Sequence, residues 1–159
     1  MSPFSFLEPI MVIAIAGCGL MAGLFFVFSV AVMQALSQLS PAEGLNAMQS
    51  INRTILNSVF LTVFFGTAIV CLGLIVCSLG QRQPGWQWAI AGASTYLVGG
   101  FVVTATRNVP MNNQLEQFSE PSPRAIEYWR TYQSLWTRWN HVRTIASASA
   151  VVMLVISLL

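Results

Sequence analysis

Four long hydrophobic segments alternate with shorter polar ones along the chain. A helix of about 20 apolar residues crosses the hydrocarbon core of a bilayer. The pattern therefore predicts four membrane-spanning helices, at about residues 10–36, 56–79, 88–106 and 142–159. We expect one domain, residues 1–159, folded as an all-α, integral membrane, antiparallel four-helix bundle. The first segment lacks the basic leader and cleavage pattern of a signal peptide, so we expect it to be retained.

Two helix starts lie well before the spans that they lead into. Ser40-Pro41-Ala42-Glu43 is a capping box with proline at the first helical position. Ser122-Pro123 repeats the serine-cap, proline-first pattern. No proline interrupts either helix before Pro84 or the C-terminus, so we expect the second and fourth helices to extend beyond the bilayer on one side. Gly44 and Gly66 are positions where the second helix could bend.

The composition excludes several classes of protein. Only 8% of the residues are charged, too few to cover a water-soluble domain, and the net charge of +2 gives no reason to expect a nucleic-acid partner. Cys18, Cys71 and Cys77 lie in apolar stretches and are interpreted as small buried hydrophobic residues. A single histidine and no cluster with ligand spacing predict no metal site and no cofactor.

Four spans place both termini and the turn at residues 80–85 on one side of the membrane. The two longer connections share the other side and carry more arginines near the span ends, which favours a cytoplasmic position for them. A bacterial chain of this kind would lie in the plasma (inner) membrane. Membrane lipids, an aromatic small molecule and other membrane subunits are the partners that we expect.

Polar residues near the spans gather at one level of the predicted bundle. One helical stripe comprises Asn46, Ser50, Arg53 and Asn57, and a second comprises Trp136, Asn140, Arg143 and Ser147. An arginine near hydrocarbon is costly unless it is paired or faces a wet cavity, so both stripes are expected to face the interior. A loop glutamate, Glu116 or Glu127, could fold back to neutralise an arginine. Otherwise Arg53 and Arg143 would form an electropositive pocket suited to a phenolate, an enolate or a lipid phosphate.

Simpler interpretations stay open for each of these residues. Arg53 and Arg143 could extend to lipid headgroups. Four asparagines (Asn52, Asn108, Asn112 and Asn113) could be caps or turn residues, and five aromatic residues (Tyr128, Trp129, Tyr132, Trp136 and Trp139) could form an interfacial belt. His141 lies about 160° around the helix from Arg143 and could be structural.

Four motifs together resemble the anthrone-oxygenase-like family of small membrane proteins. They are Gly23-Leu-Phe-Phe-Val-Phe-Ser29, Ile51-Asn-Arg-Thr-Ile-Leu-Asn57, Asn108-Val-Pro-Met-Asn-Asn113 and Trp136-Thr-Arg-Trp-Asn-His-Val-Arg-Thr144, in the family's order. Fungal members are implicated in oxidising polyketide anthrones to anthraquinones with molecular oxygen and no recognised metal or flavin. Many bacterial members have no assigned activity. The resemblance implies a four-span fold and, with it, oxidation of a polycyclic phenolic or anthrone-type substrate.

If that chemistry applies, the residues can be given roles. His141 is the candidate base, and Arg53, Arg143 and Asn140 are candidate donors to the oxyanion. Trp136, Asn57, Asn108 and Asn112 are candidate ligand contacts. The alternative is a non-catalytic accessory or structural subunit of a larger membrane complex. A small transporter ranks last, because the four predicted spans contain no Asp or Glu.

Overall fold

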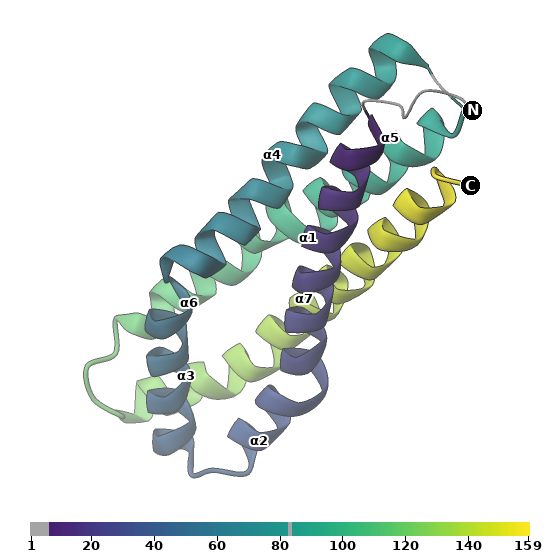
Figure 1. Ribbon diagram of the computed structural model, residues 1–159. Coiled ribbons are helices and arrows are strands. Elements are labelled where there is room, and N and C mark those ends of the chain that lie inside the picture. The colour runs from purple at the N-terminus through teal and green to yellow at the C-terminus, as the bar shows by residue number, and fades with distance from the viewer. Residues whose placement is uncertain (1–6, 83) are drawn as a thin grey trace.

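The computed structural model describes residues 7–82 and 84–159, and every regular element within them is a helix. Four helical stretches are long and apolar enough to cross a membrane, namely Leu7–Ser37, Ser58–Gly80, Trp86–Glu116 and Pro123–Ile156. The start of the first helix, the turn between the second and third, and the C-terminus lie at one end of the bundle (Figure 1). The chain is therefore an integral membrane protein built as an antiparallel four-helix bundle.

Several of these stretches consist of more than one helical segment. In order, the elements are α1 (Leu7–Val27), η1 (Phe28–Val32), α2 (Met33–Ser37), α3 (Pro41–Ile55), α4 (Ser58–Gln81), α5 (Trp86–Thr95), η2 (Tyr96–Val102), η3 (Thr104–Asn108), α6 (Val109–Glu116) and α7 (Pro123–Ile156). The η segments are π-helical and continue the α-helices on either side of them. The first spanning stretch is thus α1–η1–α2, and the third is α5–η2–η3–α6.

The two early helix starts are present, but only one of them leads into an unbroken helix. Ser122 caps α7 by accepting a hydrogen bond from the backbone N–H of Ala125, and α7 then continues for 34 residues. Ser40 and Glu43 form the capping box of α3, and the bonds from Ser40 lower the pKa of the Glu43 carboxyl. The second helix was expected to continue as well, but it ends at Ile55.

Asn57 causes this break because it serves both adjoining helix ends. Its backbone is extended, and its Oδ1 accepts a hydrogen bond from the N–H of Phe60, which begins α4. Its Nδ2 donates to the carbonyl oxygen of Thr54 in the last turn of α3. Asparagine is among the preferred N-cap residues, so this local signal outweighs helix continuation. The expectation of a single long second helix was therefore wrong, and neither Gly44 nor Gly66 marks the interruption.

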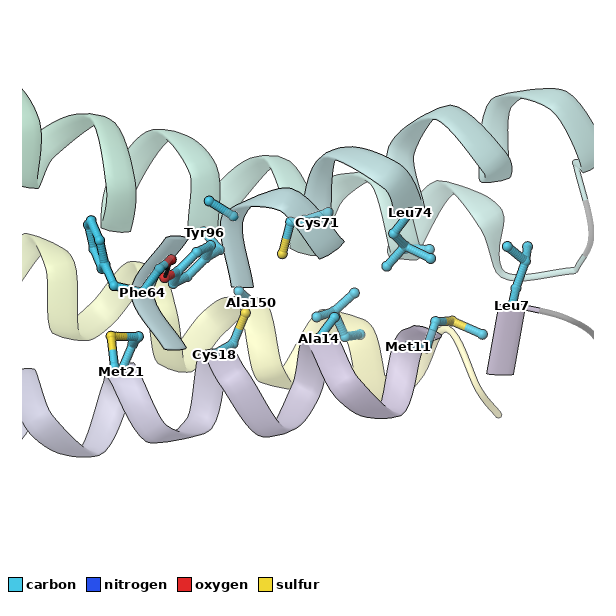
Figure 2. Packing of buried hydrophobic residues seen from close by; sticks show 14 of the residues in the cluster. Leu7, Met11, Ala14, Cys18, Met21, Phe64, Cys71, Leu74, Tyr96 and Ala150 are labelled. Carbon is cyan, nitrogen blue, oxygen red and sulfur yellow. Dashed lines mark hydrogen bonds between the residues drawn. The ribbon is translucent and has the colours of Figure 1, made fainter. Parts of the chain in front are cut away.

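Two apolar cores occupy the two ends of the bundle. The first lies among α1, α4, α5, η2 and α7, and Figure 2 shows part of it, including Cys18, Cys71 and Tyr96. Cys18 and Cys71 are buried there as free thiols, as expected, while Cys77 is half-buried. The second core joins α2, α3, α6 and the first half of α7; its buried members are Met33, Leu36, Leu45, Met48, Leu115, Ala125, Trp129, Tyr132 and Trp136.

The third spanning helix packs closely on α7 and widens near Pro110. At Gly99 an added Cβ would lie 2.3 Å from the Cβ of Ala146, so only glycine allows this approach. Pro110 has no N–H to donate to the preceding turn, and the π-helical η3 ends two residues before it. Widened turns of this kind are often found at functional sites, and η3 carries two of the residues described next.

Candidate functional site

A layer of polar side chains separates the two apolar cores. Asn140 and Arg143 on α7 are both buried, as are Thr104 and Asn108 on η3, while Ser29 on η1 is half-buried. Trp136 and Ser147, the other members of the predicted stripe on α7, are also buried. The stripe on the fourth helix therefore faces the bundle interior, as expected from the cost of exposing arginine to hydrocarbon.

Arg143 is a buried cation whose partners are all neutral. Only 5% of the residue is exposed. Its Nη1 lies 3.3 Å from the hydroxyl of Thr104, and its Nη2 donates to the Oδ1 of Asn140 at 2.5 Å. Its Cζ lies 4.3 Å from the ring centroid of Phe25 and 4.9 Å from that of Trp136. Among the described residues no carboxylate is within ion-pair distance of this guanidinium.

Asn140 fixes the position of this guanidinium from α7. The Asn140 Nδ2 donates to the carbonyl oxygen of Phe25 and to the hydroxyl of Ser29, both at 2.7 Å. Because both donor hydrogens are used, its Oδ1 must face the other way, toward Arg143. The π-helical η1 begins three residues after Phe25 and includes Ser29. The first spanning helix therefore orients Asn140, which in turn orients Arg143.

A cavity lies beside this layer, and its empty space, counted together with the part open to the outside, is about 520 Å³. It is lined mainly by apolar side chains from all four spanning stretches and α3, namely Leu24, Phe25, Phe28, Met48, Ile51, Asn52, Ile55, Leu56, Phe60, Thr104, Asn108, Val109, Asn112, Trp136 and Arg143. Leu56 and Val109 are the two exposed residues of this lining, so they mark its mouth. The interruption between α3 and α4 thus lies at the opening of the cavity.

Three buried polar atoms of this lining have no hydrogen-bond partner among the described residues. They are the Nδ2 of Asn52, the Oδ1 of Asn108 and the Nε of Arg143. The other amide atom of Asn108 is used, because its Nδ2 donates to the carbonyl oxygen of Trp136 at 3.3 Å. Buried polar groups normally have partners, so a group of unpaired ones in a cavity wall points to a bound molecule.

The indole of Trp136 forms a rigid wall of the cavity. Its Nε1 donates to the Oδ1 of Asn112 at 2.8 Å, and the Tyr132 hydroxyl donates to the same atom at the same distance. Tyr132 stacks on Trp136 with ring centroids 6.0 Å apart, and Phe28 lies 5.7 Å from Trp136 on a tilted plane. Trp129, Tyr132 and Trp136 are all buried, so these three residues do not belong to an interfacial belt.

The expected pairing of Arg53 with Arg143 across a shared interior was wrong. The Arg53 side chain is 64% exposed and forms an ion pair with Glu116 at 3.0 Å. It lines an adjoining outer cleft with Asn113 and Glu116. That cleft shares five lining residues with the cavity, namely Asn52, Ile55, Leu56, Val109 and Asn112. The other members of the predicted stripe that contains Arg53 are also exposed, namely Asn46, Ser50 and Asn57.

The polar stripe predicted around Arg53 does not face the bundle interior, because the apolar face of α3 determines the rotation of that helix about its axis. Leu45 and Met48 pack into the second core, and Gln49 beside them donates to the carbonyl oxygens of Leu115 and Phe118. Asn52 lies on this inner side, in the cavity wall. Its spacing of seven from Leu45 and four from Met48 is the sequence signal that could have identified it.

His141 and Asn57 also lie away from the cavity. His141 is exposed on α7 and is not part of the lining, in keeping with its rotation of about 160° from Arg143. Asn57 is the helix cap described above. Of the predicted site residues, the cavity thus brings together Arg143, Trp136, Asn108 and Asn112, with Asn140 directly behind Arg143. In the part of the chain that the structure describes, no group of three or more His, Cys, Asp or Glu could hold a metal ion.

Residues 53–153 match the family model described as anthrone oxygenase. No curated protein and no solved structure matches the chain. The matched range begins near the end of α3 and includes α4, the third spanning helix and most of α7, so it contains Asn108, Asn112, Trp136, Asn140 and Arg143.

Proposed function

The chain belongs to the anthrone oxygenase family, and we propose from this that its cavity binds a flat aromatic phenol or enol in its ionised form and promotes the oxidation of that anion by molecular oxygen. The observation that carries the proposal is the buried guanidinium of Arg143, which has neutral partners only. A buried charge without a counter-charge is strongly disfavoured. An anionic ligand oxygen in the cavity would supply that counter-charge.

The shape of the cavity supports an aromatic ligand. Phe25, Phe28 and Trp136 provide aromatic surfaces against which a flat ring can pack. The apolar mouth at Leu56 and Val109 suits a ligand that arrives dissolved in the bilayer.

The chemistry can proceed without a dedicated base in the cavity wall. A cation within a few ångströms lowers the pKa of an acidic ligand and so favours its anion. An anthrone that loses a proton becomes an electron-rich enolate, which can pass one electron to oxygen. Recombination of the resulting radical with superoxide forms a carbon–oxygen bond, and loss of water leaves the quinone. One anthrone and one O2 thus give one anthraquinone and one water, and Arg143 stabilises the anion from which the electron leaves.

The test is an oxidation assay on the purified protein in lipid nanodiscs. Anthrone is supplied in air, and quinone absorbance is followed against empty nanodiscs. We expect faster quinone formation with the wild type and at least a tenfold slower enzymatic rate with Arg143→Met, the scale of a lost charge contact. Arg130→Met, which alters an exposed arginine on the same helix, is the matched control. A wild-type rate no higher than that of empty nanodiscs would refute catalysis.

A second candidate function is that of a packing partner in a larger membrane complex. It is favoured by an open groove on α1, lined by Ala16, Gly19, Leu20, Gly23, Leu24 and Val27, in which nothing lies within 4 Å of a Cβ added at Gly19 or Gly23. Stable co-purification with other chains, lost in Gly19→Leu but not in Gly73→Leu, would support it. Gly73 on α4 is equally open and serves as the control.

A further inference from the structure

Asn108 offers the cavity a hydrogen-bond acceptor that the protein leaves unused. The residue is only 1% exposed, and its Oδ1 has no partner in the described part of the chain. It does not cap a helix, because its backbone is helical and its side chain makes no capping bond. The simpler interpretation of Asn108 as a cap or turn residue therefore does not hold.

The orientation of the Asn108 amide is determined by its other contact. Its nitrogen faces the carbonyl oxygen of Trp136 at 3.3 Å. Turning the amide over would place two acceptors against each other, which is unfavourable. The oxygen therefore faces away from the Trp136 carbonyl, and Asn108 is one of the residues that line the cavity. A donor group on a molecule in the cavity would satisfy this acceptor.

Arg143 lies close to this acceptor. Its guanidinium needs a hydrogen-bond acceptor, whereas the Asn108 oxygen needs a donor. Thr104, which contacts the guanidinium, is four residues before Asn108 in η3, so the two polar groups are about one helical turn apart. The Nε–H of Arg143 has no acceptor among the described residues. The cavity wall therefore matches a ligand that carries an anionic oxygen and, separately, a group that donates a hydrogen bond.

We propose that Asn108 is a specificity-determining residue that accepts a hydrogen bond from a ring hydroxyl of the ligand, while Arg143 binds the ionised oxygen of the same molecule. This inference rests on the proposed function, because it assumes that a phenolic or enolic ligand occupies the cavity. A ligand that lacks the second hydroxyl leaves the Asn108 oxygen unpaired and loses affinity. A methyl ether at the same ring position fails in the same way, since it has no hydrogen to donate.

The experiment measures binding rather than turnover, under anaerobic conditions that prevent oxidation. Anthrones with one hydroxyl at ring position 2, 3 or 4, the matching methyl ethers and unsubstituted anthrone are titrated into the full-length protein in nanodiscs, and tryptophan quenching is followed. We expect one hydroxyl position to bind about tenfold more tightly than its methyl ether, the usual effect of one hydrogen bond. In Asn108→Leu that ratio should fall to about one, while unsubstituted anthrone still binds.

Gln114→Leu is the matched control, because Gln114 is exposed on the adjoining α6 and does not line the cavity. It should keep the tenfold ratio. Equal binding of hydroxyl and ether at all three positions in the wild type would overturn the role of Asn108, even if Asn108→Leu failed to fold. A ratio that survives in Asn108→Leu would do the same. If anthrone binds but shows no such ratio, only this inference fails, whereas no binding of any compound removes the proposed function as well.

Discussion

Asn140 and Arg143, one turn apart on α7, form a buried pair in which a neutral amide oxygen accepts from a guanidinium at 2.5 Å. A carboxylate at this position would neutralise the arginine, but the amide orients it and leaves its charge available. Asn140 is itself held by the backbone of Phe25 and by Ser29. This arrangement keeps a positive charge in place beside an apolar cavity, and several predictions about stability and binding depend on it.

Replacing Arg143 with methionine should weaken the binding of an anionic ligand without lowering the stability of the protein. Methionine removes a buried charge that has no ion-pair partner among the described residues, and an uncompensated charge in an apolar interior costs more than the acceptor that Asn140 is left with. We expect Arg143→Met to unfold at the wild-type temperature or above it, while its affinity for an aromatic anion falls. Thermal unfolding in detergent, with Arg130→Met as control, measures the first effect. A loss of more than about 2 kcal/mol would indicate that Arg143 is chiefly structural.

Replacing Asn140 with aspartate should block an anionic ligand without removing the arginine. The new carboxylate would lie against Nη2 and supply the missing counter-charge. We expect affinity for the ligand anion to fall at least tenfold, as measured by tryptophan quenching. Ser78→Asp is a suitable comparison, because Ser78 is also buried, lies on α4 and does not line the cavity. Unchanged affinity in Asn140→Asp would mean that the Arg143 charge does not bind the ligand.

Gly99→Ala should destabilise the bundle. The added methyl group would lie 2.3 Å from the Cβ of Ala146, so η2 and α7 would have to move apart. Overpacking of this kind typically costs about 1–3 kcal/mol. Gly73→Ala adds the same group where nothing lies within 4 Å and should leave stability nearly unchanged. Similar unfolding temperatures for the two variants would contradict the close packing of these helices.

His141→Ala and Arg53→Met should keep most of the oxidation rate in the nanodisc assay. Both residues are exposed and neither lines the cavity, although the sequence suggested a role for each. Arg53→Met should also cost less than about 1 kcal/mol, because an exposed ion pair contributes little. A tenfold loss of rate in His141→Ala would show that the base acts from outside the cavity described above.

Features governed by one local rule could be predicted from the sequence. Four apolar segments predicted the membrane bundle, and a serine followed by proline predicted the start of α7. The cost of exposing a charge to hydrocarbon predicted that Arg143 lies inside the bundle. These features depend on short stretches of chain, so the residues concerned carry the information themselves.

Features that depend on competition between signals could not be predicted in this way. Arg53 was assigned to the interior by the same argument as Arg143, but α3 buries Leu45 and Met48, and the helix turns Arg53 toward Glu116. Asn57 interrupts the second helix because its side chain serves two helix ends at once. The cavity mouth at Leu56 follows from that interruption, so its location depends on a tertiary arrangement.

If Arg143 holds an anion in the cavity, it lowers the pKa of a phenol bound there. A nitrophenol is a suitable probe, because its anion absorbs visible light and its neutral form does not, so a pH titration of the nanodisc complex reports its ionisation. We expect a pKa at least about one unit below that of the probe in empty nanodiscs, and loss of this shift in Arg143→Met. A bound pKa equal to or above that in empty nanodiscs would contradict it.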